Sequence, residues 1–254
     1  MYPLLFFSRY APAITFETGD FFHEGEAMGI EDSYASYYLA RNSVFVYPHE
    51  FVVRIFSGKY PNFPGLKLDL DSKILDVGIG DGRNSRLLLE KGYEVWGTEI
   101  HPAIVAQTQK RFQFLGPKVP VVLVGENEIL PFQDNFFDCI LACHVIYYIK
   151  EGSDLQANLR EYHRVGKKDS LLICSVADSS SYIFKDAVEV RENLFQISSD
   201  PYMNRNGSYL TGFKNLEEAI KAFSEFYEIQ HIGRSDNDFF GIKEKLWWFV
   251  GKRK

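Results

Sequence analysis

Two acidic residues and three glycines lie close together in one short stretch, ILDVGIGDGRNS, at residues 74–85. Asp76 precedes three glycines at alternate positions, Gly78, Gly80 and Gly82, and an apolar run leads into them. Glycines in such a turn let the backbone approach a ligand closely, and the N–H groups at the start of the next helix favour an anionic group. The carboxylate of Asp76 suits a ligand that also carries a cation. The loop therefore predicts a site for a small molecule with both an ammonium and a carboxylate.

A dinucleotide is the main alternative ligand for this loop. Dinucleotide folds use G-x-G-x-x-G, in which the third glycine lets the helix pack closely on the strand. Arg83 occupies that third position, and a carboxylate beside a pyrophosphate is repelled by it. S-adenosylmethionine carries the ammonium and the carboxylate and is the favoured cofactor, with a dinucleotide and an unliganded turn as alternatives. Glu99, at the end of the next predicted strand, is expected to accept the ribose hydroxyls.

Reactive side chains also follow the apolar run at residues 139–143. His144 can titrate near neutrality and is a candidate general base, with a pocket-wall residue that touches the cofactor as the alternative. Cys139, Cys143 and His144 could suggest a metal site. However, Cys139 lies within the apolar run, where a free cysteine acts as a small buried hydrophobe, so no metal is expected.

Alternating short apolar and longer amphipathic runs must position these residues. Strands are expected over 73–77, 93–98, 119–124, 139–143 and 171–176, and helices over 84–91, 102–114 and 155–165. This alternation predicts a parallel sheet with helices on both faces. A helix near 216–226 and strands near 228–232 and 246–250 are expected to follow. Before the first strand, Pro48 and Glu50 mark the start of a helix with an apolar stripe.

Composition limits the classes of function. The 254 residues include 46% hydrophobic residues and carry a net charge of −6, which suits a globular chain and disfavours nucleic acid as a partner. The absence of an apolar run of about 18 residues predicts no membrane span. Three cysteines fit a reducing cytoplasm, the expected location, and the chain is expected to be a monomer or a homodimer. Residues 1–27 show no hydrophobic periodicity and none of the features of a signal peptide. They are expected to form an extension, and Met28 is an alternative start of the protein.

The stretch from Lys73 to Val176 resembles the class I S-adenosylmethionine-dependent methyltransferases, in particular those of type 11. DVGIGDG resembles their first motif, GTEI the acidic end of their second strand, and GENEILPF with DNFFD their G-D-A-x-x-L-P-F…D-x-x-F-D segment. The resemblance implies an α/β, Rossmann-like, seven-stranded and mostly parallel sheet with helices on both faces and an antiparallel last strand. It also implies an N-terminal extension and cap over 1–70 and a cofactor domain over 71–254. Within that domain, residues 177–213 after strand five are expected to form a lid or substrate insertion.

Carried onto this chain, the resemblance completes a set of candidate site residues. The cofactor set is Asp76, Gly78, Gly80, Gly82, Arg83, Asn84, Glu99, Ile100, Glu126, Asn127 and Cys143. Within it, the side chain of Glu126 and the backbone of Asn127 are expected at the adenine, where the family more often has Asp and Ala. The catalytic candidates are His144 and Tyr47. The acceptor set is Tyr38, His49, Tyr148, Tyr202, Asn204 and Arg205.

The expected activity is transfer of a methyl group to a small polar acceptor, with oxygen favoured over nitrogen. A weak likeness in segment order to bacterial methyltransferases of surface-polysaccharide pathways suggests a sugar or phosphoramidate-type group. The end of the fourth strand lacks the D/N-P-P-Y tetrapeptide of enzymes that methylate bases, which also disfavours nucleic acid. A non-catalytic cofactor-binding protein and a nicotinamide-dependent oxidoreductase are the alternative functions.

Overall fold

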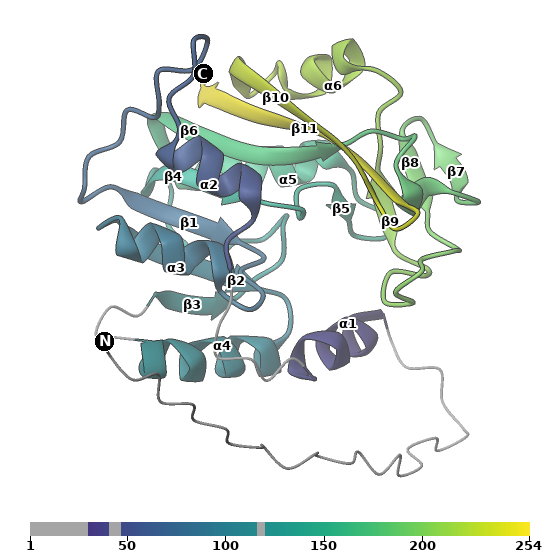
Figure 1. Ribbon diagram of the computed structural model, residues 1–254, viewed down its shortest axis with the longest axis horizontal. Coiled ribbons are helices and arrows are strands. Elements are labelled where there is room, and N and C mark those ends of the chain that lie inside the picture. The colour runs from purple at the N-terminus through teal and green to yellow at the C-terminus, as the bar shows by residue number, and fades with distance from the viewer. Residues whose placement is uncertain (1–29, 41–46, 116–119) are drawn as a thin grey trace, which may run out of the picture.

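A computed structural model describes residues 30–40, 47–115 and 120–254 of the chain, and its centre is a seven-stranded sheet (Figure 1). The strands lie in the order β3-β2-β1-β4-β6-β11-β10. Their bounds are Val121–Val124 (β3), Glu94–Glu99 (β2), Lys73–Val77 (β1), Phe137–Ala142 (β4), Gly166–Ala177 (β6), Ile242–Arg253 (β11) and Tyr227–Phe239 (β10). Neighbours from β3 to β6 pair in parallel, whereas β11 is antiparallel to both β6 and β10. The predicted α/β sheet with an antiparallel last strand is confirmed.

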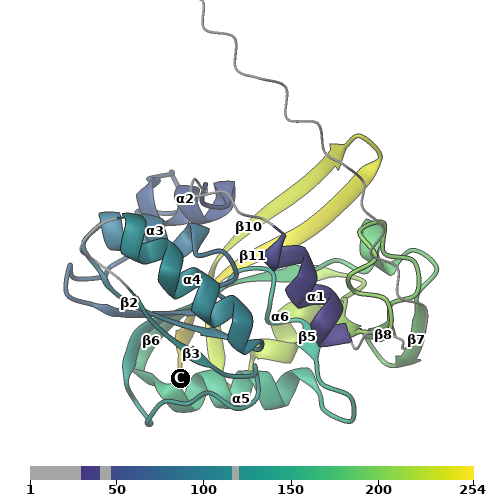
Figure 2. The ribbon, with the colours of Figure 1, turned by 90° about the horizontal axis from the view of Figure 1, so that it is seen from below.

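Helices cover both faces of this sheet. In Figure 2, α2, α3 and α4 lie on one side and α5 on the other. The helices are Ile30–Leu39 (α1), Glu50–Ser57 (α2), Arg83–Glu90 (α3), Pro102–Leu115 (α4), Leu155–Val165 (α5) and Leu216–Phe223 (α6). Because the central strands are covered on both sides, their middle residues are mostly apolar, and Cys139, Ile140 and Leu141 of β4 are fully buried.

The helix predicted after Pro48 is α2, and its sequence explains where it begins. His49 is the N-cap residue, and its side chain accepts a hydrogen bond from the backbone N–H of Phe51. Val52 and Phe56 of the predicted apolar stripe are buried against the sheet. The predicted extension over residues 1–27 lies outside the described residues.

The strands near the C-terminus are much longer than predicted. β10 and β11 pair from Tyr227 with Arg253 to Phe239 with Ile242, and the far part of this hairpin extends beyond the helices (Figure 2). In that part most side chains of β10 are exposed, so backbone hydrogen bonds rather than apolar burial hold the pairing. An apolar pattern could therefore mark only the buried half of each strand.

The insertion at residues 177–213, for which the sequence predicted no strands, contains short ones. β7 (Val188–Arg191), β8 (Leu194–Gln196) and β9 (Tyr209–Thr211) form a second, antiparallel sheet with β5 (Tyr148–Ile149), in the order β5-β9-β8-β7. These strands span two to four residues each, too few to display an alternating pattern. In the described part of the chain, no helix is long and apolar enough to cross a membrane.

Candidate functional site

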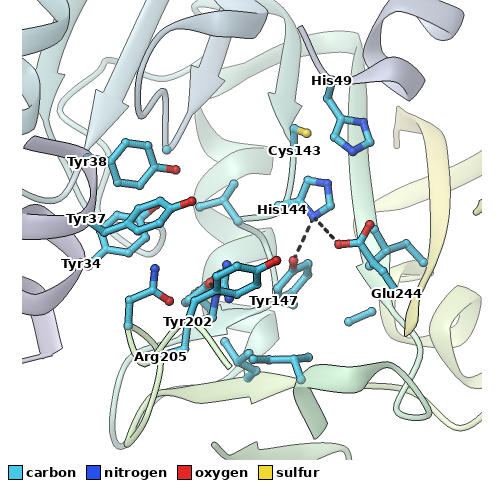
Figure 3. A pocket seen from close by; sticks show the side chains of 18 of the residues that line it. Tyr34, Tyr37, Tyr38, His49, Cys143, His144, Tyr147, Tyr202, Arg205 and Glu244 are labelled. Carbon is cyan, nitrogen blue, oxygen red and sulfur yellow. Dashed lines mark hydrogen bonds and ion pairs between the residues drawn. The ribbon is translucent and has the colours of Figure 1, made fainter. Parts of the chain in front are cut away.

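Two adjoining cavities of about 280 and 140 Å³ open at the carboxyl ends of β1, β2 and β4, the edge at which parallel sheets bind ligands. Six residues line both of them: Tyr34, Gly78, His144, Val145, Tyr148 and Asn204. Figure 3 shows the larger cavity, into which side chains from α1, the end of β4, the insertion and the hairpin project. The elements predicted to carry the site thus meet at one place.

The loop at residues 78–82, called the glycine loop, forms one wall of the larger cavity. Its three glycines have a backbone conformation that other residues avoid. Gly78, Gly80 and Gly82 have φ angles of 63°, 53° and 79°. A Cβ atom on Gly80 would lie 2.8 Å from the ring of Tyr38 in α1, and one on Gly78 would lie 2.7 Å from Val145. The loop therefore needs glycine both for its backbone angles and for the close packing of its neighbours.

Glu99 lies where a ribose acid was predicted, at the end of β2 in the smaller cavity with Ile100. Its carboxylate accepts hydrogen bonds from the backbone N–H groups of Gly80, at 3.0 Å, and Ile100, at 2.8 Å. Burial raises the pKa of Glu99, although these two hydrogen bonds oppose that shift. Each carboxylate oxygen keeps further acceptor capacity for a ligand hydroxyl.

The predicted role of Asp76 at the ligand ammonium does not agree with its position. Asp76 is 1% exposed, and its carboxylate accepts a hydrogen bond from the hydroxyl of Ser85 at 2.7 Å, beneath the loop. It is not among the residues that line either cavity. Asp81 of the same loop lines the larger cavity, together with Arg83 and Asn84. Asp81 is therefore the acid of this loop that can face a ligand.

Glu126 and Asn127 line the smaller cavity, as their predicted adenine role requires. The side chain of Glu126 is bound by Lys150, whose Nζ lies 2.7 Å from Oε2. The Asn127 side chain is engaged with protein, since its amide nitrogen donates to the carbonyls of Val145 and Tyr148. The Asn127 side chain therefore braces the turn after β4.

His144 occupies the centre of the site, directly after β4. Its φ angle is 58°, and its backbone N–H donates to the hydroxyl of Ser175. On its ring, Nδ1 lies 3.3 Å from the hydroxyl of Tyr147 and 3.9 Å from a carboxylate oxygen of Glu244 (Figure 3). Burial, followed by the nearby His49 and two arginines, lowers the pKa of His144 well below its usual range. The imidazole is therefore neutral at neutral pH and able to accept a proton.

His49 packs against His144, with ring centroids 4.7 Å apart, and against Trp248, with centroids 4.9 Å apart. The backbone N–H of His49 donates to Asn84, which joins the start of α2 to α3. Burial and the charge of Arg83 lower the pKa of His49 to about 4. Because Nδ1 accepts the N–H of Phe51, neutral His49 carries its proton on Nε2.

His49, Cys143 and His144 also bring three potential metal ligands together, since their ligand atoms lie within 4.8 Å of one another. Burial raises the pKa of the Cys143 thiol, so a metal would have to displace its proton. The other cysteine of the sequence pattern, Cys139, is fully buried within β4. The prediction of a site without a metal stays a prediction.

The structure brings all but one of the remaining predicted residues to the larger cavity. They are Tyr38, His49, Cys143, Tyr148, Tyr202, Asn204 and Arg205. Tyr47, the second catalytic candidate, is the exception, because it precedes the N-cap of α2 and its side chain is 81% exposed. Glu244 was not predicted, because it lies in a polar stretch whose hairpin pairing the sequence pattern did not reveal.

The sequence of the domain matches known methyltransferases. Residues 75–174 match the family model described as a methyltransferase domain. The chain is 33% identical over 103 residues to the uncharacterized methyltransferase YodH of Bacillus subtilis, which covers 41% of this chain and 42% of that protein. It is 30% identical over 115 residues to the demethylmenaquinone methyltransferase of Tropheryma whipplei, which covers 44% of each. The matched region thus spans less than half of the length of either relative.

Solved structures share the fold over a larger part of the chain. A methyltransferase from Methanosarcina mazei, described as SAM-dependent, has a TM-score of 0.59 at 19% identity, over 73% of this chain and 93% of that one. The N-methyltransferase NodS from Bradyrhizobium japonicum, solved with S-adenosyl-L-homocysteine, has a TM-score of 0.59 at 12% identity, over 87% and 98%. Residues 75–174 belong to the methyltransferase domain family, and the chain has the fold of the class I S-adenosylmethionine-dependent methyltransferases.

Proposed function

We propose that the protein transfers a methyl group from S-adenosylmethionine to an oxygen atom of a small polar acceptor. The position of His144 carries this proposal, because it is the one histidine among the six residues that line both the cavity of the glycine loop and the cavity of Glu99. A base at this junction would lie between the nucleoside part of a cofactor in the smaller cavity and the larger cavity, which would hold the methionine part and the acceptor.

The residues of the site fit the cofactor. Glu99 would accept the ribose hydroxyls, and Glu126 and Asn127 would border the adenine. At the start of α3 the N–H of Arg83 already donates to the carboxylate of Asp81, at 3.4 Å, so the neighbouring N–H of Asn84 would meet the carboxylate of the methionine part. Asp81 would face its ammonium group. When bound, S-adenosylmethionine supplies a methyl group whose bond to sulfur breaks as the acceptor oxygen attacks, leaving the electron pair on sulfur.

The chain's own part in the reaction is to orient the acceptor and remove its proton. Nδ1 of His144 faces Tyr147 and Glu244, so Nε2 is the nitrogen that can take a proton from an acceptor hydroxyl. The imidazolium that forms is stabilised by the carboxylate of Glu244. A sugar hydroxyl needs such a base, whereas an anionic oxygen of a phosphoramidate-type group needs only positioning. The insertion at residues 177–213 supplies Tyr202, Asn204 and Arg205 to the acceptor side.

Two measurements test this proposal in sequence. Isothermal titration calorimetry with S-adenosylmethionine and S-adenosylhomocysteine tests the cofactor, and no binding at millimolar concentration would rule it out. The protein is then incubated with cofactor bearing a deuterated methyl group and a small-molecule extract of the cells that make it. Mass spectrometry should detect a labelled product. His144→Ala should lower the rate about 100-fold or more while cofactor affinity stays the same. An unchanged rate would leave positioning as the only role of the pocket.

A further inference from the structure

Arg205 is the most unusual side chain on the acceptor side of the pocket. Its Nε donates to the hydroxyl of Tyr148 at 2.7 Å, and its Nη1 lies 3.4 Å from the hydroxyl of Tyr182. Its Nη2 has no hydrogen-bond partner among the residues that the structure describes. The side chain is 24% exposed and lines the larger cavity. A guanidinium is thus held in place by two phenols while one of its nitrogens stays available.

Asp200 holds Arg205 in position but does not use all of the hydrogen-bond donors of its guanidinium. The Asp200 side chain is fully buried and accepts hydrogen bonds from the backbone N–H groups of Tyr202, Asn204 and Arg205. Its oxygens lie 3.3 and 3.5 Å from Nη1 of Arg205, longer than the usual 2.7–2.9 Å of a charge-assisted hydrogen bond. Only one guanidinium nitrogen takes part, so the pair is not the bidentate kind that satisfies both partners. Asp200 therefore organises the loop that presents Arg205.

The charge of Arg205 also acts on His144, the candidate base, across the larger cavity that both residues line. In Figure 3, Arg205 and Glu244 lie on opposite sides of Tyr147. Arg205 lowers the pKa values of both Glu244 and His144, although burial is the largest cause in each case and raises that of Glu244. Arg205 thus brings a positive charge from the insertion, whereas the base and a carboxylate lie on the other side of Tyr147, and Arg83 contributes a second positive charge near His144. A molecule that fits both sides has an anionic group at one end and a reacting group at the other.

Asn204 is a second polar residue on this side of the pocket. It is 6% exposed, and its Oδ1 is buried without a hydrogen-bond partner among the described residues. An unpaired buried acceptor is costly, so a rotation of this amide toward the cavity, where a ligand N–H or O–H could bind Oδ1, would lower that cost. Asn204 is adjacent to Arg205 in the chain and lines both cavities, so it lies between Arg205 and the proposed cofactor site.

We propose that the acceptor carries an oxyanion, a carboxylate or a phosphate-type group, that pairs with Arg205 and holds the reacting oxygen toward His144. This proposal rests on the proposed function and names the class of its substrate. A planar guanidinium with free N–H groups matches an oxyanion better than it matches a neutral hydroxyl. The many tyrosine hydroxyls around Arg205 add donors that an oxyanion can use.

Binding of simple anions tests the proposal separately from turnover. The protein is saturated with S-adenosylhomocysteine, a step that itself tests the cofactor site, and is titrated with inorganic phosphate or with acetate. Potassium chloride at equal ionic strength corrects for screening. At least one of the two anions should raise the unfolding temperature of the wild-type complex, and the effective anion distinguishes a phosphate-type group from a carboxylate.

Matched variants assign that response to Arg205. In Arg205→Gln the anion should bind about tenfold more weakly or not at all, whereas Arg234→Gln, which removes an exposed arginine of the hairpin, should respond as the wild type does. If Arg205→Gln fails to bind S-adenosylhomocysteine, Arg205→Lys replaces it and should keep a weakened response, since lysine keeps the charge but loses the planar fork. The proposal is wrong if neither anion stabilises the wild-type complex, if the Arg205 variants respond as strongly as the wild type, or if the labelled product of the extract screen is uncharged or cationic.

Discussion

A carboxylate oxygen of Glu244 lies 3.9 Å from Nδ1 of His144, and this contact connects the hairpin of β10 and β11 to the turn after β4. An opposite charge at this distance favours the protonated imidazole, which is the form that a base acquires when it takes a proton. The carboxylate also helps to hold the ring in place through Nδ1. The hairpin is therefore part of the site as well as an edge of the sheet.

Glu244→Gln should make His144 harder to protonate. The pKa of His144, already well below its usual range, should fall further, because the variant removes the only negative charge within 4 Å of the ring in the described structure. Since the base must be neutral, the acidic limb of the pH–rate profile should move to lower pH. The plateau rate should fall about tenfold or more, because the imidazolium loses its stabilising charge.

Ring nitrogen shifts in NMR spectra measure this pKa without an acceptor, and His144→Gln assigns the signal. Asp238→Asn is the matched control, because it removes an exposed acid near the tip of the same hairpin. Equal His144 pKa values in the wild type and Glu244→Gln would show that Glu244 acts only by packing.

Gly80→Ala should disturb the contact between the glycine loop and α1. Gly80 has a positive φ, and an added Cβ would meet the ring of Tyr38 at 2.8 Å. Gly152 is the matched control, since its φ is 82° and nothing lies within 4 Å of an added Cβ. Gly152→Ala should lower the free energy of unfolding by about 1 kcal/mol through backbone strain alone. Gly80→Ala should cost about 1–3 kcal/mol more through the clash.

Urea unfolding measures both values, and Tyr38→Ala supplies the decisive comparison. In the Tyr38→Ala background the cost of Gly80→Ala should drop to that of Gly152→Ala. An undiminished cost in that background would mean that Tyr38 does not pack on the loop in solution.

Glu99→Gln should weaken binding of S-adenosylhomocysteine. A ribose hydroxyl donates a stronger hydrogen bond to a carboxylate than to an amide, and the new NH₂ group would also oppose the N–H of Gly80 or Ile100. Calorimetry should show a Kd at least about tenfold higher, equivalent to about 1.4 kcal/mol. Glu94→Gln changes an exposed acid at the start of the same strand and should leave the Kd unchanged. Equal effects of the two variants would remove Glu99 from the cofactor site.

Local sequence patterns predicted the positions of those site residues that lie at the ends of strands and helices. Glu99 ends one strand and His144 comes shortly after another, and parallel strands bring their carboxyl ends to one edge of the sheet, so the position of each polar residue after an apolar run was sufficient. The boundaries of α5 were also predictable, because Asp154 caps it and an amphipathic run continues to Val165.

Contacts that depend on side-chain direction or on distant pairing could not be predicted. Asp76 was assigned to a ligand because a strand pattern does not tell whether a carboxylate at its end faces the cavity or Ser85 beneath it. Tyr47 was placed in the pocket because members of the resembling family often fold the segment before α2 over the cofactor, yet only His49 of this segment lines the cavity. Glu244 reaches His144 through the pairing of two long strands whose exposed halves resemble an ordinary polar surface.

Asp76→Asn gives a test of the buried position of Asp76 through the pH dependence of stability. Burial raises the pKa of Asp76 from its ordinary 3.8 to about 7, even though the Ser85 hydroxyl opposes the shift. Between these two values the folded protein holds a proton that the unfolded chain has released. The free energy of unfolding contributed by this group therefore falls as the pH rises, and it is lowest above about pH 7.

Asparagine cannot ionise and can still accept the hydrogen bond of Ser85. At about pH 8 the variant should therefore be more stable than the wild type by about 2 kcal/mol, a part of what a shift of this size allows. Near pH 4 the two should be equal. The low pKa of His49 makes stability rise with pH over the same range, but it does so in both proteins and cancels in the difference. Asp138→Asn is the opposite control, since it breaks a 2.7 Å ion pair with Lys167 and should destabilise the protein at about pH 8. If Asp76→Asn destabilises the protein there as well, the Asp76 carboxylate is held in its charged form, and its sequence-based assignment to the ligand ammonium regains support.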